Sequence, residues 1–408
     1  MPADRLRIAF FVDNFYPQFN GVLTSYMNTI NELARRGHEI LVVAPKIAPR
    51  RRYDPRSFPY PLLYKRGVPA FFYPDFRLTW PFSLASVLRT RRFAADLIHF
   101  HSPLTIAMQG IATARLLRLP LVGTFHTFFA EPEYLRVVGL ESWRFLIDAG
   151  WWYNNLLYEA CDVVVSPSEW TASELLARKI RTRIEVVPNG VELSRYTVPD
   201  AARPRPASLP PLPAGADLVI YVGRISREKS IDVVIKAMER VFPIKPKAHL
   251  AIVGDGPARP ELMDYARERG LLGRITFTGM IPNEVLLASG LLGEAKLFAT
   301  ASTSENQPMT ILEAMIFGLP IVGVDAKGVP EMIRGNGFLC PPEDPDAMSR
   351  CILALLEREE LRREMAAASR RLAQEYAIER TTDKLLSVYH GAIEAKRSME
   401  RRRRGTGR

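Results

Sequence analysis

Short apolar runs alternate with segments of helical period along most of this 408-residue chain. The alternation is typical of parallel β-sheets covered by helices, because parallel strands need crossover connections. Near the N-terminus, an apolar stripe at helical spacing extends from Val22 to Ala34 and stops at Gly37, which predicts one βαβ unit. The predicted strands are residues 8–12, 40–44, 97–100, 121–124, 163–166 and 185–187, then 218–222, 250–253, 275–278, 297–299, 321–324 and 338–340.

A proline-rich segment divides the chain into two similar halves. Six prolines between Pro199 and Pro213 interrupt the alternation and leave few amides for a ladder. We therefore predict an α/β protein with an N-terminal domain (1–197), a linker (198–216), a second domain (217–375) and a C-terminal helix with a basic tail (376–408). Two such domains favour a ligand bound between them, at the carboxyl ends of the strands.

Composition excludes several classes of protein. The hydrophobic share of 47% is that of a folded chain, and no apolar run reaches the roughly 20 residues that a membrane-spanning helix needs. The N-terminus passes through Arg5 and Arg7 into a strand without an apolar signal core, so we expect a cytoplasmic protein. The cysteines lack metal-ligand spacing and are expected to be reduced thiols; they are Cys161, Cys340 and Cys351.

Positive charge is concentrated in one stretch of the chain. The formal net charge is +11, and the stretch from Lys46 to Arg92 holds eleven lysines and arginines against two aspartates. Ten aromatic residues are interleaved with them. This mixture favours an anionic membrane surface, with nucleic acid or a solvated basic loop as the alternatives. The predicted membrane and acceptor surface comprises Arg50, Arg51, Arg52, Arg56, Lys65 and Arg66.

Two carboxylates, Glu305 and Glu313, flank the point where a loop becomes a helix. The free amides and positive dipole end of a helix attract an anion, while carboxylates accept hydrogen bonds from vicinal hydroxyls. A nucleotide-sugar carries both kinds of group. The alternative is structural: Thr310 caps the helix and Glu313, three residues later, completes a capping box.

Two cations follow the first strand of the second half. Gly223 marks a turn there, and Arg224 and Lys229 can neutralise a diphosphate leaving group; a solvated basic turn is the alternative. Gly254 and Gly256 also follow a strand, but the third glycine of a dinucleotide fingerprint is missing. We attribute these glycines to a tight strand-to-helix turn and expect no nicotinamide or flavin cofactor.

The first half contains further polar candidates. Gly21 would let a phosphate or a sugar approach a helix N-terminus. His126 follows the carboxyl end of a strand, a position that favours a functional role; a structural histidine is the alternative. His99 and His101 share one face of a strand, but the sequence offers no evident third metal ligand. The pair Asp344 and Asp346 is interpreted as a helix N-cap region.

In their order and spacing, these residues resemble family 4 of the retaining nucleotide-sugar glycosyltransferases. That family has the GT-B fold, in which two Rossmann-like domains place parallel sheets across a central cleft and the C-terminal helix returns to the first domain. Within it, the stretch from Phe100 to Tyr134 and the basic aromatic segment from Lys46 to Arg92 are most similar to bacterial diacylglycerol glucosyltransferases. The motifs that carry the resemblance are residues 20–22, 96–103, 124–127, 187–191, 223–229, 253–257 and 305–313.

The resemblance implies a role for each matching residue. Glu305 would bind hydroxyls of the donor sugar, Glu313 the ribose diol, and Arg224 with Lys229 the diphosphate. His126 would lie beside the transferred sugar, and no metal or other cofactor would be needed. The implied catalytic residues are His126, Arg224, Lys229 and Glu305, and the implied donor-binding residues are Gly21, Gly223, Arg224, Lys229, Glu305, Asn306, Gln307, Met309, Thr310 and Glu313.

One position departs from the family pattern. Pro308 stands where glycine is usual, so one backbone donor is missing, whereas Asn306 and Gln307 keep theirs. We expect transfer of a hexose, glucose from UDP-glucose, to a lipid hydroxyl such as that of diacylglycerol, by a protein attached peripherally to the inner face of the cell membrane. The alternatives are mannose transfer to an inositol lipid or a soluble sugar, and a basic binding protein that has kept the fold without activity.

Overall fold

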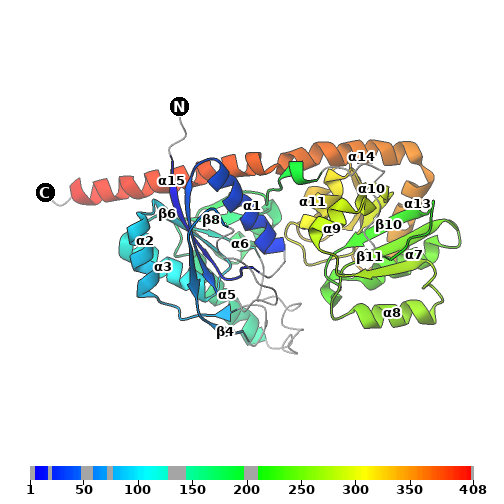
Figure 1. The fold of residues 1–408 in the computed structure, drawn as a ribbon, viewed down its shortest axis with the longest axis horizontal. Helices are drawn as coiled ribbons and strands as arrows, with labels where there is room; N and C mark the ends of the chain where they lie inside the picture. Colours follow the sequence, from blue (N-terminus) through cyan, green and yellow to red (C-terminus); the bar gives the residue numbers. More distant parts are fainter. Residues whose placement is uncertain are drawn as a thin grey trace. The chain divides into compact units, whose positions relative to one another are not determined.

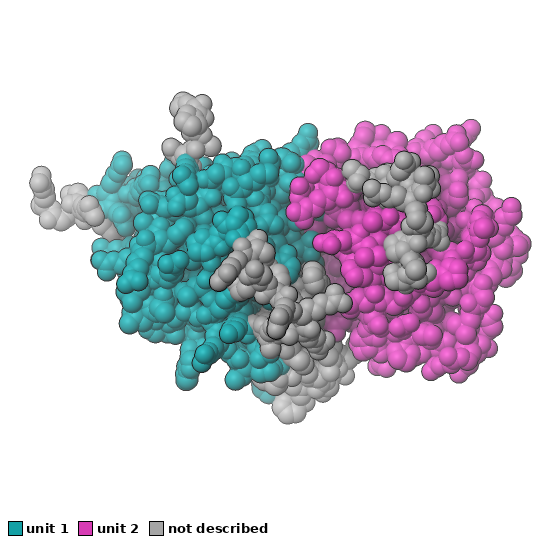
Figure 2. Space-filling view, viewed as in Figure 1, with its two compact units in different colours: residues 1–191, 378–408 teal, residues 192–377 magenta. Residues whose placement is uncertain are grey.

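The computed structural model describes residues 5–16, 21–46, 58–70, 77–126, 144–196 and 210–405. Contacts divide the chain into two compact units, shown in Figure 2. Unit 1 comprises residues 1–191 and 378–408, and unit 2 comprises residues 192–377. The chain therefore passes between the units at residues 191–192 and again at 377–378. Residues 210–216, the described part of the predicted linker, form no helix or strand.

Unit 1 is built on a seven-stranded parallel sheet with the order β3-β2-β1-β6-β7-β8-β9. The order reverses at β1, which pairs with β2 on one side and β6 on the other. Ligands of such sheets bind outside the carboxyl ends of the strands at this switch point. The strands are β1 (Arg7–Val12), β2 (Glu39–Pro45), β3 (Leu62–Lys65), β6 (Leu97–His101), β7 (Leu121–Thr124), β8 (Val163–Ser166) and β9 (Ile184–Val186), and a separate antiparallel pair is formed by β4 (Val68–Pro69) and β5 (Arg77–Leu78).

Helices cover both faces of this sheet (Figure 1), because successive strand residues are apolar and point to opposite faces. Phe10 points toward α1 (Gly21–Arg35) and α15 (Ile378–Gly405), where it packs in one cluster with Tyr389. Phe11, the next residue, lies in the opposite cluster with residues of α3 (Thr105–Leu117) and α5 (Arg144–Tyr158). The last helix thus returns to unit 1, as predicted. The other helices are α2 (Leu84–Phe93) and α6 (Glu169–Ala177).

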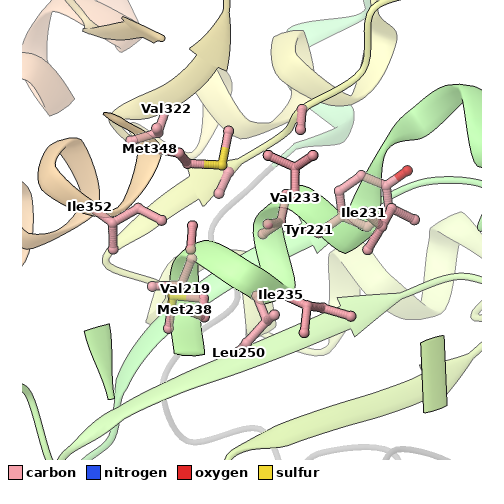
Figure 3. Packing of buried hydrophobic residues seen from close by; sticks show 14 of the residues in the cluster. Val219, Tyr221, Ile231, Val233, Ile235, Met238, Leu250, Val322, Met348 and Ile352 are labelled. Atoms are coloured by element: carbon pink, nitrogen blue, oxygen red, sulfur yellow. The ribbon is translucent and has the colours of Figure 1, made fainter. Parts of the chain in front are cut away.

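Unit 2 contains a six-stranded parallel sheet with the order β12-β11-β10-β13-β14-β15 and its own switch point between β10 and β13. Figure 3 shows the core on one face, where Met238 of α7 and Met348 of α13 pack against strand residues such as Val219. The strands are β10 (Asp217–Val222), β11 (Ala248–Val253), β12 (Ile275–Gly279), β13 (Leu297–Ala299), β14 (Ile321–Val324) and β15 (Gly337–Cys340). The helices are α7 (Ile231–Val241), α8 (Arg259–Glu268), α9 (Asn283–Ala288), α10 (Leu291–Glu294), α11 (Met309–Ile316), α12 (Val329–Met332), α13 (Pro345–Glu357) and α14 (Glu359–Ala373).

The α/β prediction is confirmed, and all twelve predicted strands are present with ends displaced by two residues at most. The edge strand β3 was not predicted, because it lies within the basic aromatic segment that we interpreted as surface. Asp344 accepts a hydrogen bond from the Ala347 amide, which confirms the N-cap interpretation. The three cysteines are free thiols, and the Sγ atoms of Cys340 and Cys351 lie 3.4 Å apart. Within the described ranges, no helix combines the length and the apolar character needed to cross a bilayer.

Candidate active site

Lys229 and Glu305 meet at the switch point of unit 2. Lys229 ends the short helix η4 (Arg227–Lys229) that follows β10, and Glu305 lies in the loop after β13, the neighbour of β10 in the sheet. The Lys229 Nζ atom lies 2.6 Å from Glu305 Oε1, and the Ser302 hydroxyl donates to the same oxygen at 3.0 Å. Parallel strands therefore unite a cation and a carboxylate that are 76 residues apart in the sequence.

The loop that carries Arg224 lies against the loop after β11, and glycine makes this approach possible. A Cβ on Gly254 would lie 1.8 Å from the Gly223 carbonyl oxygen, and one on Gly256 would lie 2.2 Å from that of Ile225. The Ile225 amide also donates to the Asp255 carbonyl at 2.9 Å. These glycines thus allow close packing against the loop that is the candidate for diphosphate binding. This agrees with the structural role that we assigned to them. The Arg224 side chain is exposed.

The start of α11 contradicts the capping-box interpretation. The N-cap residue is Pro308, no side chain caps the helix, and Thr310 lies inside it. Glu313 bonds instead to two side chains: its Oε1 atom accepts from the Tyr196 hydroxyl at 3.2 Å and from Asn283 Nδ2 at 3.3 Å. The first intrahelical bond runs from the Leu312 amide to the Pro308 carbonyl, so the preceding amides of the helix have no carbonyl in their own helix to bond.

Burial changes the acidity of Glu313. The residue is 7% exposed, and its burial raises the pKa of the carboxyl group from 4.5 to about 7, against the lowering effect of the Tyr196 and Asn283 hydrogen bonds. Each further hydrogen bond that a ligand donates to this carboxylate stabilises its charged form. Asn306 and Gln307, also implied in donor binding, are buried beside the start of the helix.

Gly328 supports the loop that carries Glu305. Its amide donates to the Glu305 carbonyl at 2.9 Å, and a Cβ at this position would lie 1.7 Å from the Asn306 carbonyl oxygen. We did not predict site roles for Gly328, Ser302, Tyr196 or Asn283. For Tyr196 no sequence signal connects the two partners, because 117 residues separate it from Glu313.

In unit 1, His126 belongs to a buried set of histidines beside the ends of β6 and β7. His126 Nε2 lies 2.8 Å from His101 Nδ1. The rings of His99 and His101 are 4.2 Å apart, and His99 Nδ1 lies 2.6 Å from the Tyr389 hydroxyl of α15. The prediction that His99 and His101 share a face is confirmed, but we did not predict that His126 joins them.

Burial keeps these imidazoles neutral. It lowers the pKa of His126 to about 4 and that of His99 to about 3, so neither carries a charge near pH 7. Both nitrogens of His99 are engaged, with the hydroxyls of Tyr389 and Thr124, and His101 Nδ1 pairs with His126 Nε2. His101 Nε2 is buried without a hydrogen-bond partner among the described residues. In the part of the chain that the structure describes, no group of three histidines, cysteines or acids is arranged to hold a metal ion.

The end of β1 supplies a second buried group that sequence reasoning missed. Asp13 accepts hydrogen bonds from the amides of Leu104, Ile106 and Ala107 at the start of α3, at 3.1, 2.8 and 3.3 Å. Its burial raises the pKa of the carboxyl group to about 7. Gly21 is the first residue of α1, as its predicted place at a helix N-terminus requires, and Asn20 lies outside the described residues.

Comparison with known proteins identifies the family of this chain. The family model described as Glycosyltransferase Family 4 matches residues 19–195, and the model described as Glycosyl transferases group 1 matches residues 210–372. The two matches together span most of both units. The chain belongs to family 4 of the glycosyltransferases.

Two curated relatives are similar to this glycosyltransferase over most of its length. The alpha-monoglucosyldiacylglycerol synthase of Streptococcus pneumoniae is 27% identical over 325 residues, which cover 78% of this chain and 70% of that protein. The GDP-mannose-dependent alpha-mannosyltransferase of Mycobacterium tuberculosis is 26% identical over 414 residues, which cover 97% of this chain and 99% of that protein.

Solved structures establish the GT-B fold of this glycosyltransferase. Anabaena Alr3699/HepE, solved in complex with UDP-glucose, superposes with a TM-score of 0.72 at 20% identity. The match covers 95% of this chain and all of that one. At this identity the likeness concerns the fold alone.

The basic aromatic segment of the glycosyltransferase is described only in part. Arg50, Arg51, Arg52 and Arg56 lie outside the described residues. Lys65 is half-buried; its Nζ atom donates to the hydroxyl of Ser83, the N-cap of α2, at 2.7 Å, and burial lowers its pKa.

Exposed apolar side chains lie on β4, in the segment after β5 and on α2. Trp80 is 83% exposed, and Leu84 and Leu88, one turn apart on α2, are 60% and 46% exposed. We call Val68, Trp80, Phe82, Leu84 and Leu88 the apolar patch; exposed cations at Arg66, Arg89, Arg91 and Arg92 flank it in the sequence.

Proposed function

We propose that this protein is a retaining hexosyltransferase that moves glucose from UDP-glucose to a lipid hydroxyl such as that of diacylglycerol. The observation that carries the proposal is the contact of Lys229 with Glu305 in the unit that also holds Glu313 and the start of α11. A cation, two carboxylates and free helix amides match the diphosphate, the hydroxyls and the ribose of a nucleotide-sugar.

In the proposed reaction, the donor diphosphate takes the place of Glu305 on Lys229. Glu305 is then free to accept hydrogen bonds from the sugar, and Arg224 provides the second cation for the diphosphate. The bond between the sugar C1 atom and the diphosphate oxygen breaks while C1 bonds to the acceptor oxygen on the same face. The acceptor proton passes to the departing diphosphate. Two cations and the helix dipole supply the stabilising charge, so this mechanism requires no bound metal.

A lipid acceptor is supported by a relative and by the surface of unit 1. The pneumococcal relative is a diacylglycerol-directed synthase by name, and it shares 27% identity with this chain. The apolar patch can enter the headgroup region, and each neighbouring cation contributes about 1 kcal/mol near an anionic leaflet. We therefore propose peripheral attachment to the inner face of the cell membrane.

Mannose transfer from GDP-mannose, to an inositol lipid or a soluble sugar, is the second candidate. It is favoured by the mycobacterial mannosyltransferase, whose match covers 97% of this chain and 99% of that protein. A third reading, an inactive binding protein, conflicts with the presence of Arg224 and with the paired Lys229 and Glu305.

One experiment separates these candidates. Purified protein is incubated with UDP-glucose or GDP-mannose, each with diacylglycerol, phosphatidylinositol or free sugars, and the products are identified by mass. We expect glucosyl-diacylglycerol with the α configuration, checked by NMR of the anomeric proton. A mannosylated product would establish the second candidate, and no product with any pair would support the third.

A further inference from the structure

Glu313 is held through one of its two oxygens. The Tyr196 hydroxyl and Asn283 Nδ2 both donate to Oε1, at 3.2 and 3.3 Å. Oε2 has no hydrogen-bond partner among the described residues. It is not one of the fully buried side-chain atoms that lack a partner, so it is accessible to a ligand. A carboxylate oxygen offers about two acceptor positions, so the open oxygen can receive the two hydroxyls of a vicinal diol.

Both donors are fixed by the structure around them. Tyr196 is the C-cap residue of the short helix η3 (Leu193–Arg195), and its ring lies edge-on to Phe317 with centroids 6.4 Å apart. Asn283 is the first residue of α9, and Glu313 itself lies on α11. The two donors and the carboxylate therefore come from three separate elements. The two hydrogen bonds to Oε1 restrict the rotation of the carboxylate.

We propose that Tyr196 and Asn283 are positioning residues of the nucleotide site, which hold Oε1 of Glu313 so that Oε2 receives the ribose hydroxyls of the donor. This inference rests on the donor role proposed for Glu313. The two residues do not touch the reacting atoms. They restrict the orientation of the carboxylate before the nucleotide binds, and this lowers the entropic cost of binding.

The first test removes one hydroxyl. Tyr196→Phe keeps the ring against Phe317, and the affinity for UDP alone is measured by calorimetry on the full-length protein. A hydrogen bond to a charged group contributes enough that we expect about tenfold weaker binding. Tyr265→Phe is the matched control, because the Tyr265 hydroxyl donates to Glu239 at 2.9 Å elsewhere in the same unit; its UDP affinity should equal that of the wild type.

A second probe separates positioning from a general structural effect. The same variants are titrated with 2′,3′-dideoxyuridine diphosphate, which has the base and the diphosphate but neither ribose hydroxyl. Tyr196→Phe and Asn283→Leu should weaken UDP binding and leave the binding of this analogue unchanged. An equal loss for UDP and for the analogue would overturn the proposal, because the variants would then act on the whole site.

Glu313→Gln distinguishes failure of this inference from failure of the donor assignment. If Glu313→Gln leaves UDP affinity unchanged in a folded protein, the donor role of Glu313 is wrong and the inference fails with it. If Glu313→Gln weakens binding but Tyr196→Phe and Asn283→Leu do not, the donor role stands and the positioning role is wrong. In support, Tyr196→Phe should add no loss in the Glu313→Gln background. If the wild type binds GDP rather than UDP, GDP and its dideoxy analogue replace the uridine probes.

Discussion

The two units use the same sheet topology to build chemically opposite sites. In unit 1, β6 and the segment that follows β7 carry the buried, neutral histidines His99, His101 and His126. In unit 2, the loops after β10 and β13 carry an ion pair between Lys229 and Glu305, whose side chains are 19% and 21% exposed. A switch point in a parallel sheet therefore fixes where side chains converge, while residue type and burial decide whether they carry charge.

The strongest test of this contrast removes charge from unit 2. Arg224→Ala and Lys229→Ala should each lower turnover by about 10²-fold or more, because each removes a preorganised cation that stabilises the diphosphate leaving group. Arg227→Ala is the matched control: Arg227 lies between the two, pairs with Glu261 on the surface, and has a side chain that is 75% exposed. Its activity should stay near that of the wild type.

A chelator tests the same charge from another side. We expect EDTA to leave transfer intact, since the mechanism assigns the neutralisation of the diphosphate to Arg224 and Lys229. Loss of activity with EDTA and its recovery with Mg²⁺ or Mn²⁺ would show that a metal ion performs this neutralisation.

The two carboxylates of unit 2 should separate in their effects. Glu313→Gln should weaken UDP binding by roughly 1 to 3 kcal/mol, the range for leaving a polar partner unpaired. Glu305→Gln should chiefly harm sugar transfer, because it leaves Lys229 available to the diphosphate and replaces the charged acceptor of the sugar hydroxyls by a neutral amide. Calorimetry with UDP and product formation from the intact donor measure the two effects, and equal losses of UDP affinity would contradict the assignment.

Glu313 and His126 should make stability respond to pH with opposite sign. Glu313 has a pKa raised from 4.5 to about 7, so the folded state binds more protons than the unfolded state within that window, and stability falls as pH rises. His126 has a pKa lowered from 6.5 to about 4, so stability falls as pH decreases through that window. The two effects oppose each other between about pH 4.5 and 6.5 and partly cancel in the wild type.

Single variants reveal the cancellation. Each group contributes a slope of at most about 1.4 kcal/mol per pH unit to the free energy of unfolding. Urea unfolding between pH 4.5 and 7 should therefore show that Glu313→Gln makes stability rise more steeply with pH, whereas His126→Asn makes it rise less steeply. The same change of slope in both variants would show that the two buried groups do not differ in the way we infer.

The sequence was sufficient for elements whose signal is local. Most residues of the predicted strands are apolar, and short apolar runs identify buried parallel strands without knowledge of their neighbours. The edge strand β3 lacks this signal: its four residues are half-buried, and it lies among prolines and cations. Lys65 illustrates the consequence, because counting charges suggested a membrane cation, whereas the folded chain directs it to Ser83.

The candidate site was predictable where one motif contained its residues. Glu305 and Glu313 lie on one loop and helix, but the partners that decide between capping and ligand binding, Tyr196 and Asn283, come from distant segments. His101 and His126 are likewise 25 residues apart and meet because β6 and β7 pair. The assembly of such contacts depends on strand order, and an apolar pattern does not encode strand order.

The smallest expected effects concern the membrane, where single side chains act additively. The apolar patch should contribute a salt-resistant part of vesicle binding, since apolar burial is not screened, and the basic residues a salt-sensitive part. Trp80→Ala should weaken binding to anionic vesicles several-fold at both low and high salt, with Met280→Ala, at an exposed apolar position of unit 2, as the matched control. Replacing Arg50, Arg51, Arg52 and Arg56 by Ser should reduce sedimentation with anionic vesicles sharply at low salt and little at high salt, while transfer to a short-chain soluble acceptor persists. If the wild type prefers duplex DNA to anionic lipid at matched salt, or if Trp80→Ala and Met280→Ala behave alike, unit 1 does not present a membrane surface, and the lipid acceptor loses its physical support.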